Sequence, residues 1–164
     1  MSGCEVVVVA LESTLATLEM IVADFSDADL LVRPVPGANH AAWQLGNVIG
    51  GDPFLVTAEL PAVAYPELPA GFADLHGGKG SKNDDDPGFL TKDGYLTLLR
   101  EVRAVTVAAV RALSDADLSK PSSEKMRWAG PTLAHVLLFA AQHTTLHAGQ
   151  FTVIRRKLGK PVLF

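Results

Sequence analysis

The chain has 164 residues, of which 48% are hydrophobic and 20% are charged, and its formal net charge is −4. These values are ordinary for a globular chain that buries one core, so we expect a single domain over residues 1–164. The acidic balance argues against a dedicated nucleic-acid-binding protein, and no apolar stretch is long enough to span a membrane. No basic residues precede the apolar N-terminal run, and Cys4 is the only cysteine. We therefore expect a cytoplasmic protein without a signal peptide or an internal disulfide.

The N-terminal segment predicts a helix over about residues 3–24. Ser2 followed by Glu5 has the spacing of a capping box, in which each residue satisfies a backbone N–H of the other. The sequence SDADL at 26–30 then predicts a short turn of helix, which the following prolines and glycine should end.

A second long helix is expected over about residues 39–60, with Asn39 as its N-cap. The Pro- and Gly-rich segment 61–90 predicts a long connection rather than a simple turn between neighbouring helices. Its run GGKGSKNDDDPG at 77–88 favours a solvated charged loop, and His76 beside it is expected to be solvated as well. A phosphate-binding loop is the alternative, but the run has no P-loop pattern.

The second half of the chain repeats the plan of the first. Thr91 can cap a third long helix over about 91–113, and SDADL returns letter for letter at 114–118. Asn47 and His135 each stand 21 residues after the serine of their own SDADL segment. The sequence therefore predicts an all-α four-helix bundle made of two pseudo-repeated helical hairpins joined by a long crossover loop.

The fourth long helix, expected over about 131–158, carries the strongest chemical signal. One broad arc of this helix is apolar, and it includes His143 and His147. Because these histidines lie one turn apart, both can reach the same ion. Imidazole nitrogens favour Zn, Ni, Cu or Fe over Mg or Ca.

Two histidines are too few ligands for a metal site, so the third ligand should come from another helix. The second long helix offers Asn47, Asp52 and Glu59. His135 is too far along the axis to join the pair and is expected to be a buried structural histidine. The alternative is a metal-free core in which the histidines hydrogen-bond to each other, to Gln150 or to threonines.

Three aromatic side chains near the starts of the second and fourth long helices are expected to have structural roles. Trp43 and Trp128 should fill the core, and His40 should be a partly exposed capping or packing residue.

Several segments of the chain resemble the DinB/YfiT-like superfamily. They are NHAAWQLG at 39–46 with the GGD that follows, HTTLHAGQ at 143–150, the closing RRKLGKP, the central loop and both SDADL segments. The resemblance covers nearly the whole chain, and the pattern HxxxHxGQ is its most specific part. It implies a four-helix bundle, commonly dimeric, with a divalent metal that is often Zn or Ni. The family includes metal-dependent hydrolases, thiol-dependent transferases and isomerases, and members without known activity.

The resemblance also implies a metal triad, made of both histidines of HxxxHxGQ and one histidine directly after the W-x-x-G segment. The first two map to His143 and His147, but the third maps to Asn47. A carboxamide oxygen is a poorer ligand than imidazole for such metals, so the metal should be bound weakly, use Asp52 instead, or be absent. Four further side chains are expected around the site or its substrate pocket: Gln150, Asp52, Trp43 and His135.

Two functions from different classes agree with these observations. The first is a metal-dependent hydrolase or thiol-dependent transferase that acts on a small molecule. The alternative is a metal-free dimeric bundle that serves as a small-molecule-binding or interaction protein. The first and third long helices carry a surplus of Val, Ala and Leu, in EVVVVAL and VRAVTVAAVRAL, which predicts a homodimer.

Overall fold

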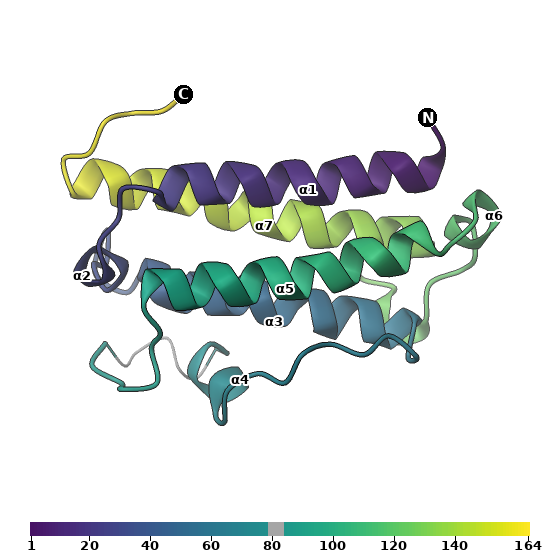
Figure 1. The fold of residues 1–164 in the computed structure, drawn as a ribbon, viewed down its shortest axis with the longest axis horizontal. Helices are drawn as coiled ribbons and strands as arrows, with labels where there is room; N and C mark the ends of the chain where they lie inside the picture. The colour runs from purple at the N-terminus through teal and green to yellow at the C-terminus, as the bar shows by residue number, and fades with distance from the viewer. Residues whose placement is uncertain (79–83) are drawn as a thin grey trace.

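A computed structural model of the chain describes residues 1–78 and 84–164, in which four long helices form a bundle (Figure 1). The long helices are α1 (Gly3–Val22), α3 (Ala41–Glu59), α5 (Lys92–Arg111) and α7 (Leu133–Lys157). Shorter helices lie in the connections: α2 (Asp27–Leu30), α4 (Phe72–Leu75), α6 (Asp115–Leu118) and the 3-10 turn η2 (Glu124–Met126). The predicted all-α four-helix bundle is confirmed. Within the described residues, no helix is long and apolar enough to cross a membrane.

The two halves of the chain do not form separate hairpins in which consecutive long helices pack on each other. Helix α1 packs on α7 and α5, and α3 packs on the same two helices. Consecutive long helices, α1 with α3 and α5 with α7, therefore lie diagonally across the bundle, and the two halves of the chain interlock. The connection from α3 to α5 runs back along the bundle and carries α4 (Figure 1). Because of this return, α3 and α5 point in the same direction.

Both SDADL segments form the short helices that the repeat predicted. In α2, Ser26 Oγ accepts a hydrogen bond from the Asp29 N–H (3.1 Å), and the Asp29 carboxylate accepts one from the Ser26 N–H (2.8 Å). Ser114 and Asp117 form the same capping box at α6, at 3.3 and 2.8 Å. The two segments lie at opposite ends of the bundle (Figure 1). The repeated sequence therefore corresponds to a repeated local structure, since each SDADL segment forms the same capped short helix.

The helices that follow the SDADL segments are not in equivalent register. Helix α3 begins 15 residues after the serine of its segment, whereas α7 begins 19 residues after, about one helical turn later. Asn47 is therefore deep within α3, while His135 is in the first turn of α7. The His135 side chain is exposed, and its Nδ1 lies 2.8 Å from Thr132 Oγ1. The prediction of a buried His135 is wrong.

Other predictions about helix starts and burial need correction. The N-cap of α3 is His40 rather than Asn39: its Nδ1 accepts a hydrogen bond from the Trp43 N–H (3.1 Å), and the side chain is fully buried rather than partly exposed. Trp43 is buried as expected, but Trp128 is 60% exposed and does not fill the core. The apolar surplus of α1 is exposed, at Val6, Val9 and Met20. The corresponding side chains of α5 point largely into the core instead.

The crossover is less solvated than its composition suggests. Helix α4 packs on α3, and His76, at the C-terminal end of α4, is only 2% exposed. Its Nε2 lies 2.7 Å from the Tyr95 hydroxyl, and its Nδ1 lies 2.8 Å from the Phe72 carbonyl. The prediction of a solvated His76 is wrong, because a glycine at position 46 leaves room for the imidazole against α3: a Cβ there would be 2.0 Å from the ring. Part of the charged run, residues 79–83, lies outside the described residues.

One buried ion pair connects all four long helices. Arg103 of α5 and Asp52 of α3 are both buried, with Nε 3.0 Å from Oδ2. The Arg103 guanidinium also donates hydrogen bonds to Thr144 Oγ1 of α7 (2.7 Å) and to the Leu11 carbonyl of α1 (3.3 Å). Thr106 adds a hydrogen bond to the Asp52 carboxylate (2.8 Å). The Asp52–Arg103 pair therefore satisfies buried charges within the bundle, beside the site described next.

Candidate metal centre and adjoining pocket

Three polar side chains from α3 and α7 meet between the two helices. His147 Nε2 lies 3.1 Å from His143 Nε2 and 3.2 Å from Asn47 Oδ1. The two imidazole rings are nearly perpendicular, with centroids 4.7 Å apart. The i, i+4 spacing on α7 and the position of residue 47 on the facing helix bring these atoms together, as the sequence predicted.

Gln44 determines which nitrogen of His147 carries the hydrogen. The Gln44 Nε2 donates a hydrogen bond to the Asn39 carbonyl (2.8 Å), which turns its Oε1 toward His147 Nδ1 at 3.1 Å. An amide oxygen can only accept, so Nδ1 of His147 must donate. The Nε2 of His147 is therefore left with a lone pair that faces the centre.

The Asn47 amide is oriented in the same way. Its Nδ2 donates a hydrogen bond to the His76 carbonyl (3.0 Å), so its Oδ1 faces His147 Nε2. Two lone-pair atoms thus face each other at 3.2 Å, and a hydrogen on His143 Nε2, 3.1 Å from His147 Nε2, can satisfy the His147 atom. A cation between the three atoms would satisfy all of them.

The donor atoms fit a divalent transition metal. Ligands about 2.1 Å from a tetrahedral ion stand about 3.4 Å apart, close to the 3.1 Å and 3.2 Å that separate His147 Nε2 from His143 Nε2 and Asn47 Oδ1. Two imidazole nitrogens and one amide oxygen suit Zn or Ni, with Asn47 as the weakest ligand. In the described part of the chain, no three or more His, Cys, Asp or Glu side chains form a group that could hold a metal. The amide oxygen is therefore the third donor available.

Four of the other candidates from the sequence are engaged elsewhere or lie away from the centre. The Asp52 carboxylate pairs with Arg103, and the Glu59 carboxylate accepts hydrogen bonds from the Ser123 N–H and hydroxyl at 3.0 and 2.6 Å. Asp52 therefore does not replace the missing histidine. Gln150 and His135 are exposed on α7. Trp43 packs near His147, with ring centroids 6.4 Å apart.

The orientation of His147 and Asn47 by Gln44 and His76 was not predicted from the sequence. Gln44 stands three residues before Asn47, so both lie on the same face of α3, and this spacing is the signal that could have found it. The contribution of His76 comes from its backbone carbonyl and depends on how the crossover folds. No local pattern in the sequence indicates it.

Burial keeps both histidines neutral. Desolvation, together with the neighbouring His143, lowers the pKa of His147 to about 4. Desolvation also lowers the pKa of His143, and the nearby Arg103 guanidinium adds to this effect. Neutral imidazole is the form that binds a metal, so the site is ready to bind at neutral pH without first losing protons.

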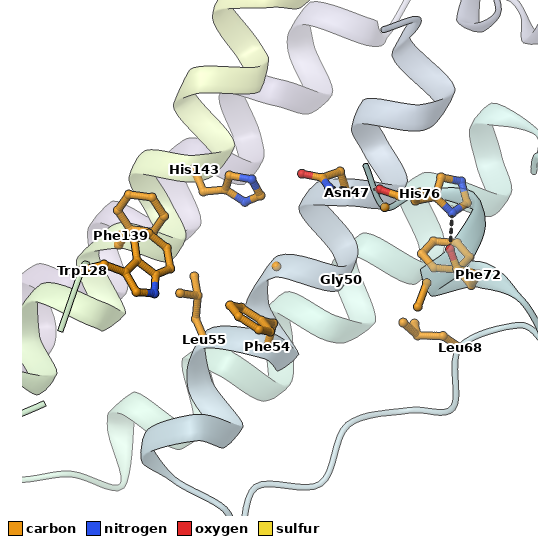
Figure 2. Close-up of a pocket in the computed structure, with 14 residues that line it drawn as sticks. Asn47, Gly50, Phe54, Leu55, Leu68, Phe72, His76, Trp128, Phe139 and His143 are labelled. Carbon is orange, nitrogen blue, oxygen red and sulfur yellow. Dashed lines mark hydrogen bonds between the residues drawn. The ribbon is translucent and has the colours of Figure 1, made fainter. Parts of the chain in front are cut away.

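A pocket of about 460 Å³ opens beside these side chains (Figure 2). His143, Asn47 and His76 form its polar end, and most of the remaining lining is apolar or aromatic. Gly51 lets the His143 ring lie against α3, because a Cβ at this position would be 2.7 Å from Nδ1. The arrangement places a small-molecule pocket in direct contact with His143 and Asn47, two of the three converging side chains, while His147 lies behind them.

These features define the class of protein: a four-helix bundle in which a histidine pair meets an amide oxygen between two helices, beside a pocket lined by one histidine of the pair and by the amide side chain. A profile of the DinB superfamily matches residues 10–151, and the chain belongs to this superfamily. A solved structure described as a conserved protein from Enterococcus faecalis is similar over 98% of this chain and 99% of that chain, with a TM-score of 0.71 and 16% identity. At that identity the likeness concerns the fold alone. No curated protein matches the sequence.

Proposed function

We propose that the chain binds a divalent transition metal, Zn or Ni, through His143 Nε2, His147 Nε2 and Asn47 Oδ1, and acts on a small molecule in the adjoining pocket. The observation that carries this proposal is the pair of lone-pair atoms, His147 Nε2 and Asn47 Oδ1, held face to face at 3.2 Å by their own hydrogen bonds. Holding two acceptors in this way is unfavourable unless a proton or a metal ion lies between them.

The residues of the chain have distinct parts in such a site. Gln44 keeps the hydrogen of His147 on Nδ1, and the His76 carbonyl keeps the Asn47 oxygen toward the centre. The apolar part of the pocket excludes water from a bound molecule. When bound, the metal supplies a Lewis acid that activates a water or a thiol, so hydrolysis and thiol transfer are the reactions we propose.

Metal affinity tests the proposal most directly. In protein purified without an affinity tag and stripped of metal, Asn47→His should tighten Zn or Ni binding at least about tenfold, because imidazole replaces the weakest ligand. His147→Gln should weaken it by a similar factor or more. Gln142→His, which adds an imidazole on the exposed side of α7, is the matched control and should leave affinity unchanged. If Asn47→His also leaves affinity unchanged in a folded protein, Asn47 is not a ligand.

A metal-free binding protein is the second candidate. It is favoured by the asparagine itself, because Asn47 already has a hydrogen-bond partner in His76 and a hydrogen on His143 Nε2 can serve His147. Elemental analysis at known protein concentration separates the two candidates. Metal well below one equivalent after equilibration with micromolar Zn and Ni would favour this second function.

A further inference from the structure

Large aromatic side chains surround the mouth of the pocket. Phe54 of α3 is 51% exposed and Trp128, just before α7, is 60% exposed, although exposed aromatic surface is costly in water. Both line the same pocket, together with Phe139 of α7. Among the described residues, the only other Phe, Trp or Tyr that is as exposed is Phe164, at the end of the chain. The exposure of Phe54 and Trp128 is therefore concentrated at one site.

One wall of the pocket is aromatic from Trp128 through Phe139 to His143 (Figure 2). The Trp128 and Phe139 rings meet edge to face, with centroids 5.0 Å apart at 83°. The Phe139 ring is in turn nearly parallel to that of His143, at 14° and 6.3 Å. A flat ring that enters along this wall meets π-systems over its whole path.

The floor of the pocket is bare helix backbone. Gly50 of α3 lies one turn before Phe54, and a Cβ at Gly50 would meet no other atom within 4 Å. The missing side chain therefore leaves open space in the pocket rather than allowing close packing. A side chain at this position would project into the space that a ligand would occupy.

Without a metal, the pocket offers no charge to a ligand. None of the described side chains that line it is acidic, and none is lysine or arginine. Lys125 is outside, with its Nζ 5.1 Å from the centroid of the Phe54 ring. A charged ligand body would lose its hydration in the pocket without gaining a counter-ion, so an uncharged body is favoured.

We propose that this pocket binds an uncharged, flat aromatic ring system that carries one polar substituent. The ring lies over Gly50, between Phe54 and the wall of Trp128 and Phe139, and the substituent is directed toward His143 and Asn47. This inference rests on the small-molecule site of the proposed function and names its ligand class, but it does not require a metal. A volume of about 460 Å³ is sufficient for a bicyclic ring with a small head group.

The test uses 2-naphthamide as a neutral flat probe and 2-naphthalenesulfonate as its charged counterpart. Calorimetric titration of the chelator-treated full chain should show binding of the amide, and at least tenfold weaker binding of the sulfonate. Gly50→Leu should weaken binding of the amide at least tenfold. Gly149→Leu is the matched control, because Gly149 is also a helical glycine with no atom within 4 Å of a Cβ, on the exposed side of α7. Phe54→Ala, at a half-exposed position, should also weaken binding.

Several results would overturn the inference. They are no binding of the amide by the wild-type chain, equal binding by Gly50→Leu and Gly149→Leu, or sulfonate binding as tight as that of the amide. A dimer that binds no probe and dissociates in Phe54→Ala would assign the aromatic side chains to an interface between copies, and would overturn it too. Because the titration is done without metal, a chain that binds the probe but takes up no Zn or Ni on later equilibration with either ion would refute the metal proposal and leave this one standing.

Discussion

Gln44 offers the sharpest test of the proposed centre, because it acts on the metal only through His147. Replacing it with methionine keeps a side chain of similar length but removes the acceptor of the His147 Nδ1–H and the donor to the Asn39 carbonyl. His147 is then free to move its hydrogen to Nε2, the atom that should bind the metal. Loss of such a supporting hydrogen bond costs about 10- to 100-fold in metal affinity, which is about 1.4 to 2.7 kcal/mol.

The stability of the metal-free protein should change as well. Gln44 is completely buried, so its two hydrogen bonds are lost without replacement by water. We expect the free energy of unfolding to fall by about 2 to 3 kcal/mol. Gln150→Met is the matched control: Gln150 belongs to the HxxxHxGQ pattern but is exposed, so neither affinity nor stability should change.

Competition with a chromophoric chelator measures the Zn affinity of each variant, and long-range ¹H–¹⁵N NMR reports the tautomer of His147. In the metal-free wild type, His147 should be protonated at Nδ1, and in Gln44→Met a substantial fraction should be protonated at Nε2. Wild-type affinity in Gln44→Met together with an unchanged tautomer would refute the reasoning. It would mean that other contacts fix the imidazole.

Three further predictions concern pH, the buried ion pair and assembly. In chelated protein, His147 should contribute about 2 kcal/mol to the fall in the free energy of unfolding from pH 7 to pH 4.5, because the unfolded His147 takes up a proton below about pH 6.5 whereas the folded one stays neutral until about pH 4. Urea unfolding of His147→Gln should show a fall smaller by about that amount, with the remainder due to groups such as His143, whose pKa is also lowered by burial. Arg103→Met should cost about 3 to 5 kcal/mol, because Asp52 is left as an unpaired buried charge. We also propose a homodimer through the exposed apolar face of α1, which Val9→Glu should dissociate in sedimentation experiments.

Each of these has a result that would contradict it. The sign of the pH effect follows from a depressed folded-state pKa, so stability that rises as the pH falls would be the wrong direction. If Arg103→Met and Arg103→Met with Asp52→Asn are equally unstable, the loss is one of packing rather than of charge pairing. A wild-type chain that sediments at 17.4 kDa at micromolar concentration would exclude the dimer.

The features that sequence predicted well are those that depend on a few neighbouring residues. The capping box of Ser2 with Glu5 follows from a three-residue spacing, and the proximity of His143 and His147 follows from the helical repeat. Asn47 was placed opposite the histidines only by the resemblance to a family, because no local rule pairs one helix with another. For the same reason, Gln44 was missed although it stands in the same motif.

The wrong predictions of burial and register share one cause: hydrophobic periodicity does not show which other helices a given helix packs against. Helix α7 packs on both α1 and α3, so even the polar side chains of Thr144 and Arg155 are buried, while Leu146 is 61% exposed. Equal spacing after SDADL suggested that His135 matches Asn47, but the longer connection before α7 shifts its start by about one turn. The hydrophobic pattern of a helix does not indicate how long the connection before it is.

The Asp52–Arg103 pair has a consequence for the axial alignment of the helices. Apolar side chains pack almost as well when one helix slides past another, whereas a guanidinium with partners on α1, α3 and α7 is satisfied in one alignment alone. Asp52 lies one residue beyond Gly51, which contacts the His143 ring, and Thr144 directly follows that histidine. The pair therefore fixes the axial alignment of α3 and α7 that brings Asn47 opposite the two imidazoles. The apolar residues around it are then free to diverge in sequence while the centre keeps its geometry.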